Sequence, residues 1–265
     1  MRKKLVCALI GIVVILSIVA FFIIRRENSQ LRDKFFIYKG NQYLAYSSTE
    51  DEIGINILIV DSIGNKEKFE TNKAQLQMIH ENGSAILPEE YKVEELDSNS
   101  LYSLYKLDIC LHNDGKTGTS RYNQIEIDGK RYDIGNVVID VIKEKEENNL
   151  VISTSPYAVD NSGFTLYMTN NGNAEVKAIC AEYDLEGDGK YTTCDLGNQK
   201  VEKELDLSFG IKTNDKKSII NNYSLRPRIK ISIDGKEKYI LPPVTTEYLL
   251  SISKEDIINY INEEL

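Results

Sequence analysis

The segment from Cys180 to Cys194 has the most distinctive chemistry in the chain, because acidic residues there alternate with other types before a glycine. This spacing resembles that of calcium loops of the D-x-D-x-D-G kind, in which alternate carboxylates converge on the cation and glycine permits a sharp bend. The pattern predicts a calcium site. Its candidate ligands are Asp184, Glu186, Asp188, Lys190 through its carbonyl oxygen, and Asp195 at the twelfth position.

The loop departs from that pattern in three ways. Glu186 is longer than the usual Asp or Asn, and Asp195 stands where a bidentate Glu is usual. No helical pattern clearly flanks the loop. A plain acidic turn is therefore the competing interpretation of the same residues.

The two cysteines that bound this segment suggest a disulfide bond. A hairpin centred on Gly187 places Cys180 opposite Cys194. Facing residues at a non-hydrogen-bonded pair lie about 4.5 Å apart at Cα, within the range that a disulfide accepts. The bond is expected if this part of the chain lies outside the cell, and two separate buried thiols are the alternative.

Motifs of known enzymes are scarce. The chain contains two histidines, and His80-Glu81 lacks the second histidine of H-E-x-x-H. No G-x-S-x-G, G-x-G-x-x-G or P-loop sequence occurs. Cys110 and His112 lie two apart in a predicted strand and so share a face, a pattern more typical of core and edge than of a nucleophile and base. We therefore expect no enzyme, although the many carboxylates leave an acid pair open.

The elements expected to position these residues are β-strands. From Phe35 onward, runs of four to eight β-branched and aromatic residues are separated by Gly, Asn, Asp or Ser. Asp128-Gly129 and Asp234-Gly235 predict two-residue type I′ hairpins, since both residue types tolerate positive φ. The turn spacing suits antiparallel immunoglobulin-like β-sandwiches, although the chain has no Trp for the antibody-type signature.

The strand pattern divides the chain into parts. Residues 27–34 form a short linker, 35–146 a first β-sandwich domain and 150–265 a second one with a short C-terminal helix capped by Ser253. Residues 71–98 are expected to form a crossover with a short helix that starts near Pro88. The sequence around the second Asp-Gly turn resembles the first at an offset of 106 residues, so related tandem domains are one option and unrelated β domains another.

Residues 5–24 contain no charge and no proline. As a helix they would span about 30 Å, the thickness of a bilayer's hydrocarbon core. Basic residues flank this stretch on both sides, so residues 1–26 predict a retained single transmembrane signal-anchor. The larger basic cluster precedes it, which favours an amino terminus inside and a body outside the cytoplasm.

Three other interpretations of this stretch fit its residues less well. A removable signal peptide has a shorter apolar region and small residues at the cut, whereas Phe21 and Phe22 continue the run here. A lipoprotein signal at Cys7 lacks a preceding apolar region. A buried core helix usually keeps a polar face, which these residues do not provide.

Charge restricts the class of partner. The net charge is −9, and because residues 1–26 contribute five basic and no acidic residues, the remaining 239 residues carry −14. A body this acidic repels phosphate backbones, which argues against nucleic acid. Abundant Lys, Ile and Asn are typical of low-GC bacterial genomes.

Together these features predict a mainly β, membrane-tethered extracytoplasmic module of a bacterial cell envelope. It would bind a protein or glycan or give structural support, and strand tyrosines such as Tyr38, Tyr43 and Tyr46 could line the binding surface. A membrane-anchored cell-wall hydrolase with unidentified carboxylates is the first alternative. An accessory subunit of a transporter or secretion complex is the second.

Overall fold

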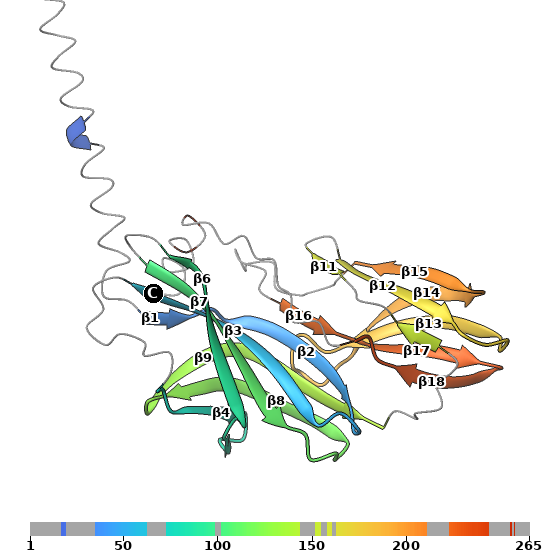
Figure 1. Cartoon of the computed structure of the whole chain (residues 1–265), viewed down its shortest axis with the longest axis horizontal. Coiled ribbons are helices and arrows are strands. Elements are labelled where there is room, and N and C mark those ends of the chain that lie inside the picture. The colour runs from blue at the N-terminus through green and yellow to red at the C-terminus, as the bar shows by residue number, and fades with distance from the viewer. Residues whose placement is uncertain are drawn as a thin grey trace, which may run out of the picture.

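The protein is built from β-strands, as the sequence predicts. The structure, a computed structural model, describes residues 17–19, 35–62, 73–98, 102–143, 152–154, 158–160, 163–210 and 223–243, together with Glu255 and Ile257. These residues contain eighteen strands. The strands gather into two parts, which we call the first half (residues 35–143) and the second half (residues 152–243) (Figure 1).

Two sheets form the first half. Sheet A has the strand order β1-β3-β7-β6, and sheet B has the order β16-β2-β9-β8-β4-β5. Pairing is antiparallel except that β2 runs parallel to both β9 and β16. The strands are β1 (Phe35–Ile37), β2 (Gly40–Ser47), β3 (Glu52–Ser62), β4 (Leu76–His80), β5 (Ala85–Ile86), β6 (Glu90–Ser98), β7 (Tyr102–His112), β8 (Gly118–Ile127), β9 (Lys130–Ile142) and, from the second half, β16 (Tyr223–Arg226).

Alternation of side chains builds the core between sheets A and B. Along residues 53–59 of β3 and 107–111 of β7, every second residue is a buried Ile or Leu, and Ile57 lies opposite Leu107. Met78 on β4 and Ile125 on β8 meet them from sheet B. The polar residues between these positions face outward, which places the acidic side chains of sheet A on its outer surface.

The second half also has two sheets. In sheet C, β12 pairs with β10, β11 and β15, and sheet D has the order β14-β13-β17-β18. Phe164, Leu166 and Ile231 contribute to its core. The strands are β10 (Ile152–Thr154), β11 (Ala158–Asp160), β12 (Gly163–Asn170), β13 (Val176–Tyr183), β14 (Thr192–Val201), β15 (Glu204–Phe209), β17 (Arg228–Ile233) and β18 (Lys236–Ile240).

The Asp-Gly turns are confirmed and occupy equivalent places in the two halves. Asp128 and Asp234 have φ of 49° and 47°, and φ of the glycine after each is also positive. The side chain of Asp128 accepts a hydrogen bond from the backbone N–H of Gln75, and the backbone N–H of Asp128 donates one to the Gln75 carbonyl. Asp234 makes the same two hydrogen bonds with Glu175, and both partners directly precede a neighbouring strand. The order β9-β8-β4-β5 thus matches β18-β17-β13-β14, which supports related halves.

One segment of chain belongs to both halves. Residues 223–226 add to the edge of sheet B as β16, and after Pro227 the chain continues as β17 in the middle of sheet D (Figure 1). Proline cannot donate a ladder hydrogen bond, so the pairing changes there. Within residues 35–243, the two predicted domains on either side of the boundary at residues 146–149 are therefore joined by a shared strand; the boundary itself stays a prediction.

Strands β2 and β9 are buried on both faces at this junction. Leu44 and Tyr46 point into the core of the first half, whereas Tyr43 and Ala45 join the core of the second half. Val138 on β9 also packs into the core of the second half. The second half therefore packs against the back of sheet B.

Some predicted elements differ or lie outside the described residues. The crossover with a helix expected in residues 71–98 is wrong, because residues 76–98 form β4, β5 and β6. Of the C-terminal helix, only Glu255 and Ile257 are described, and both are helical. The predicted span at residues 5–24 lies outside the description except for residues 17–19, and none of the described helical residues belongs to a helix long and apolar enough to cross a membrane.

Candidate functional site

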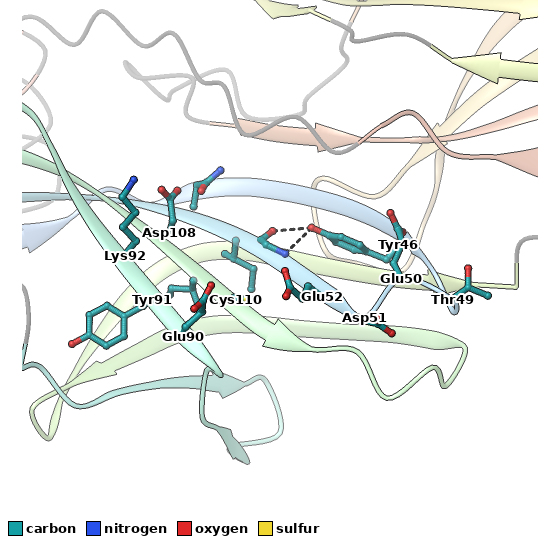
Figure 2. A pocket seen from close by; sticks show the side chains of 14 residues that line it. Tyr46, Thr49, Glu50, Asp51, Glu52, Glu90, Tyr91, Lys92, Asp108 and Cys110 are labelled. Carbon is teal, nitrogen blue, oxygen red and sulfur yellow. Dashed lines mark hydrogen bonds between the residues drawn. The ribbon is translucent and has the colours of Figure 1, made fainter. Parts of the chain in front are cut away.

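An open groove runs over the outer face of sheet A, with a volume of about 850 Å³. It crosses β3, β7 and β6 and ends at the turn between β2 and β3 (Figure 2). We call it the acidic groove, after the carboxylates among its lining residues. They are Glu50, Asp51, Glu52, Glu90 and Asp108.

Only some of these carboxylates are neutralised within the protein. Arg226 donates to both oxygens of Glu50, at 3.0 and 2.8 Å. Lys106 contacts Asp108 at 3.3 Å. Asp51, Glu52 and Glu90 have no basic partner among the described residues, and the lining includes one lysine, Lys92. The groove therefore offers uncompensated negative charge.

Lys106, next to the groove, has a raised pKa. Partial burial lowers its pKa, but hydrogen bonds to Glu94 and Asp108 outweigh that effect and raise the pKa above its ordinary value. The ion pairs fix these two carboxylates on β6 and β7. Asp51, Glu52 and Glu90 stay available to a ligand.

Side chains of β2 close part of the β3 edge that borders the groove. The Tyr46 hydroxyl donates to the carbonyl of Gly54 at 3.0 Å and accepts from its N–H at 2.9 Å (Figure 2). Gln42 donates to the carbonyl of Asn56 at 2.6 Å. The guanidinium of Arg226 lies over the Tyr46 ring, 5.0 Å from its centroid. The floor of the groove is thereby tied to the contact between the halves.

Cys110 lies in the groove but is not activated as a nucleophile. Burial raises the pKa of its thiol, and the carboxylates of Glu52, Glu90 and Glu89 raise it further. A thiol in such surroundings stays protonated near neutral pH. His112 is exposed and pairs through Nδ1 with Glu89 at 3.1 Å. The arrangement therefore gives no support to nucleophilic catalysis by Cys110 and His112.

The cysteines of the predicted disulfide are free thiols in the structure. Cys194 lies opposite Ala181, and Cys180 lies opposite Asp195, one residue away from the predicted register. The shift is already present at the turn, where Tyr183 lies opposite Thr192, and the bulge between Ala178 and Cys180 comes only beyond the cysteines. Because successive strand residues point to opposite faces, Cys194 faces the core while Cys180 contacts Glu182 at 3.7 Å.

The predicted calcium ligands are dispersed. Asp184 is buried, accepts from the Gly189 N–H at 2.9 Å and pairs with Arg121 at 3.4 Å. Asp188 pairs with Lys190 at 2.7 Å. Asp195 lies on β14, away from this turn, and no group of three or more suitable ligands occurs in the described residues. Calcium binding stays a prediction, which a rise in melting temperature at millimolar calcium would support.

A second charged cluster lies between the halves. Asp140 on β9 accepts hydrogen bonds from Tyr43 at 2.7 Å, Tyr191 at 3.1 Å and Arg228 at 3.3 Å. Arg228 also pairs with Glu182 at 2.7 Å, and its guanidinium lies 3.9 Å from the centroid of the Tyr191 ring. This cluster is enclosed, so its role is to join the halves.

Comparison with known proteins gives no family. No family model matches the chain, and no curated protein matches it. Among solved structures, the crystal structure of YadV chaperone matches at 10% identity, covering 78% of this chain and 99% of that one, with a TM-score of 0.21. A TM-score this low implies neither a shared fold nor a shared function.

The tyrosine surface expected from the sequence is wrong, because Tyr38, Tyr43 and Tyr46 are each at most 1% exposed. Sequence reasoning also missed the acidic groove and the cluster around Asp140. The available signal for the groove was weak: three acidic residues are consecutive at 50–52, and acidic residues are interspersed with apolar ones at 89–97. Nothing in the spacing indicated that these segments lie two strands apart in one sheet.

Proposed function

We propose that the protein is a membrane-tethered, extracytoplasmic module of a bacterial cell envelope that binds a protein or glycan partner through the acidic groove. The carrying observation is the set of carboxylates Asp51, Glu52 and Glu90, which lack basic partners among the described residues and line one open groove. Ligand sites are typically concave, with volumes of about 300–1,000 Å³ and a few convergent polar groups.

The firm connection between the halves suits a binding scaffold. The groove ends at Glu50, which Arg226 of β16 holds, and the same chain continues into the core sheet of the second half. A ligand in the groove thus meets preformed backbone and side chains, which lowers the ordering cost of binding. We propose further that each half is an immunoglobulin-like sandwich, as the matching strand orders suggest.

Binding is favoured over catalysis by the character of the groove. It is open along the sheet, and its thiol has a raised pKa rather than a lowered one. The membrane tether is supported by the apolar residues 5–24 of the sequence. Membership of a transporter or secretion complex is a more specific version of the same proposal.

The test uses the full chain as bait in detergent-solubilised envelope, with bound proteins and glycans identified by mass spectrometry. The groove variant Asp51→Lys/Glu52→Lys should lose the partner that the unaltered chain retains. The control variant Glu202→Lys/Glu204→Lys makes the same charge change at exposed positions elsewhere and should retain it. Equal recovery by both variants would refute the groove as the site.

The position of the body is tested separately. Protease added to intact cells should cleave residues 27–265, whereas a cytoplasmic control protein should stay intact. Protection of these residues until the cells are lysed would place the body inside and contradict the proposal.

A further inference from the structure

Strand β6 is an edge strand beside the acidic groove. It pairs with β7 on one side, and no described strand pairs with its other side. It is nine residues long, and its sequence, EYKVEELDS, has four acidic residues and one lysine. An edge of this length presents a row of backbone N–H and C=O groups to which an extended chain can pair.

The two faces of β6 differ in chemistry. Glu90, Lys92 and Glu94 point to the outer surface, and the first two line the acidic groove. Tyr91 and Val93 point the other way and pack against the core. Figure 2 shows this alternation for the side chains of Glu90, Tyr91 and Lys92.

A second depression lies along β6 on the side of Tyr91 and Val93. Its volume is about 550 Å³, and its lining includes Leu76, Leu87 and Pro88. Leu87 is 68% exposed and Leu96, on β6 itself, is 47% exposed. These are two of the three large apolar side chains most exposed in the described part of the two halves, so apolar surface is concentrated at this edge.

We propose that β6 pairs with an extended, cationic segment of a partner protein in which basic and apolar residues alternate. An added strand projects successive side chains to opposite faces. One set would lie beside Glu90 above the acidic groove, next to Glu94, which pairs with Lys106, and the other would enter the depression beside Leu87. This inference rests on the proposed binding function and names the class of ligand.

The charge of β6 also argues against a second copy of the same chain. Two β6 strands placed edge to edge would bring their acidic side chains together, and charged edges are a common protection against such pairing. A cationic strand, by contrast, is attracted to β6 by these acidic side chains. The edge therefore discriminates in favour of a basic segment.

The test measures binding of a fluorescein-labelled nine-residue peptide of alternating Lys and Val to the full chain by fluorescence anisotropy. Two further versions carry N-methyl groups on either all lysines or all valines. In strand addition, only one of these sets directs its N–H groups toward β6. One version should therefore bind as the parent does, and the other should bind at least about tenfold more weakly, since several backbone hydrogen bonds are lost.

Equal affinity of the two methylated versions would overturn strand addition, as would absence of binding by the parent peptide at millimolar concentration. The edge variant Glu90→Lys/Glu94→Lys should weaken binding of the parent peptide by at least about tenfold, whereas Glu202→Lys/Glu204→Lys should not change it. If the peptides fail while the groove variant still loses its envelope partner, the proposed function stands and only the strand addition falls.

Discussion

Asp140 on β9 and Arg228 on β17 form an ion pair of 3.3 Å that joins the two halves of the protein. Their side chains are only 5% and 17% exposed. Arg228 directly follows Pro227, where the shared segment leaves sheet B for sheet D. The pair thus holds the chain at the point where its hydrogen-bonding partners change.

Removal of Arg228 should be strongly destabilising. Arg228→Met leaves the buried Asp140 and the half-buried Glu182 without their cation, and breaking a buried pair typically costs about 3–5 kcal/mol. We expect the free energy of unfolding, measured in urea, to fall by about 3 kcal/mol. Lys230→Met is the matched control on the same strand, because Lys230 pairs with the exposed Glu237. A similar loss in both variants would contradict this role of Arg228.

The coupling between the two charges can be measured directly. In a double-mutant cycle with Asp140→Asn and Arg228→Met, the interaction energy should be about 1–3 kcal/mol, as is usual for side chains in one network. Additive effects would mean that the halves are joined mainly by β16 and the apolar contacts.

Stability should fall steeply in alkali because of Tyr43. Burial, together with the charge of Asp140 and the hydrogen bond to it, raises the pKa of Tyr43 above its ordinary value. Above a pH of about 10 the unfolded chain loses this proton while the folded chain keeps it. Its stabilising contribution is complete below that pH and is lost as pH rises, by about 1.4 kcal/mol per pH unit.

The measurement is urea unfolding at pH 10 to 11. Burial above all also raises the pKa values of three other tyrosines, Tyr122, Tyr191 and Tyr239. The slope of the unfolding free energy against pH therefore reflects the ionisation of several tyrosines. Tyr43→Phe should make the slope shallower by about one proton. Tyr167→Phe, at a position 47% exposed, serves as the control. An unchanged slope in Tyr43→Phe would show that Tyr43 ionises while folded.

Two glycines with similar backbone angles should respond very differently to alanine. Gly129 and Gly135 have φ of 80° and 82°. A Cβ at Gly129 meets no atom within 4 Å, whereas a Cβ at Gly135 would overlap the backbone of Gly40 on β2. Gly129→Ala should cost about 1–2 kcal/mol from strain alone.

Gly135→Ala adds a clash with main chain that cannot rotate away. We expect it to cost at least about 2 kcal/mol more than Gly129→Ala in urea unfolding. Equal costs would mean that β2 and β9 separate easily at Gly40, which would weaken the description of β2 as a strand fixed on both sides.

Local features of the fold were predictable, whereas the site was not. The turns at Asp128-Gly129 and Asp234-Gly235 depend on φ preferences of two adjacent residues, so the sequence is sufficient to place them. The sequence predicts a short helix from Pro88 through Leu96, because Pro88 and two glutamates resemble a helix start. Pairing with β7 overrides that propensity, and pairing depends on residues elsewhere in the chain.

The charged contacts were also not predictable, because their partners are distant in the sequence. Glu50 and Arg226 are 176 positions apart, and no spacing rule connects them. The register of the β13–β14 hairpin failed for a different reason: from the turn outward, the pairs run from Tyr183–Thr192 to Cys180–Asp195, so Cys194 lies opposite Ala181 instead of Cys180. The register of a hairpin depends on the conformation of its turn, and the acidic sequence between Tyr183 and Thr192 did not reveal that conformation.

Thiol labelling decides between the two registers in solution. The structure has Cys110, Cys180 and Cys194 as free thiols, so alkylation of the denatured, unreduced protein should label all three. In the folded protein Cys110, which is partly exposed, should react before Cys180, which is 7% exposed. Burial and the charge of Glu182 raise the pKa of Cys180 to about 11, so only about one thiol in a thousand is ionised at pH 8.

The control is the same protein reduced before denaturation, which should give an identical labelling pattern by peptide mass spectrometry. A Cys180–Cys194 linked peptide in the unreduced digest would show that the hairpin adopts the register in which Cys180 lies opposite Cys194, instead of the one found in β13 and β14. Cys194 would then have to leave the core, where it contacts Tyr183 at 3.6 Å. Because one residue of slip reverses every side chain of the strand, the core of the second half would have to repack as well.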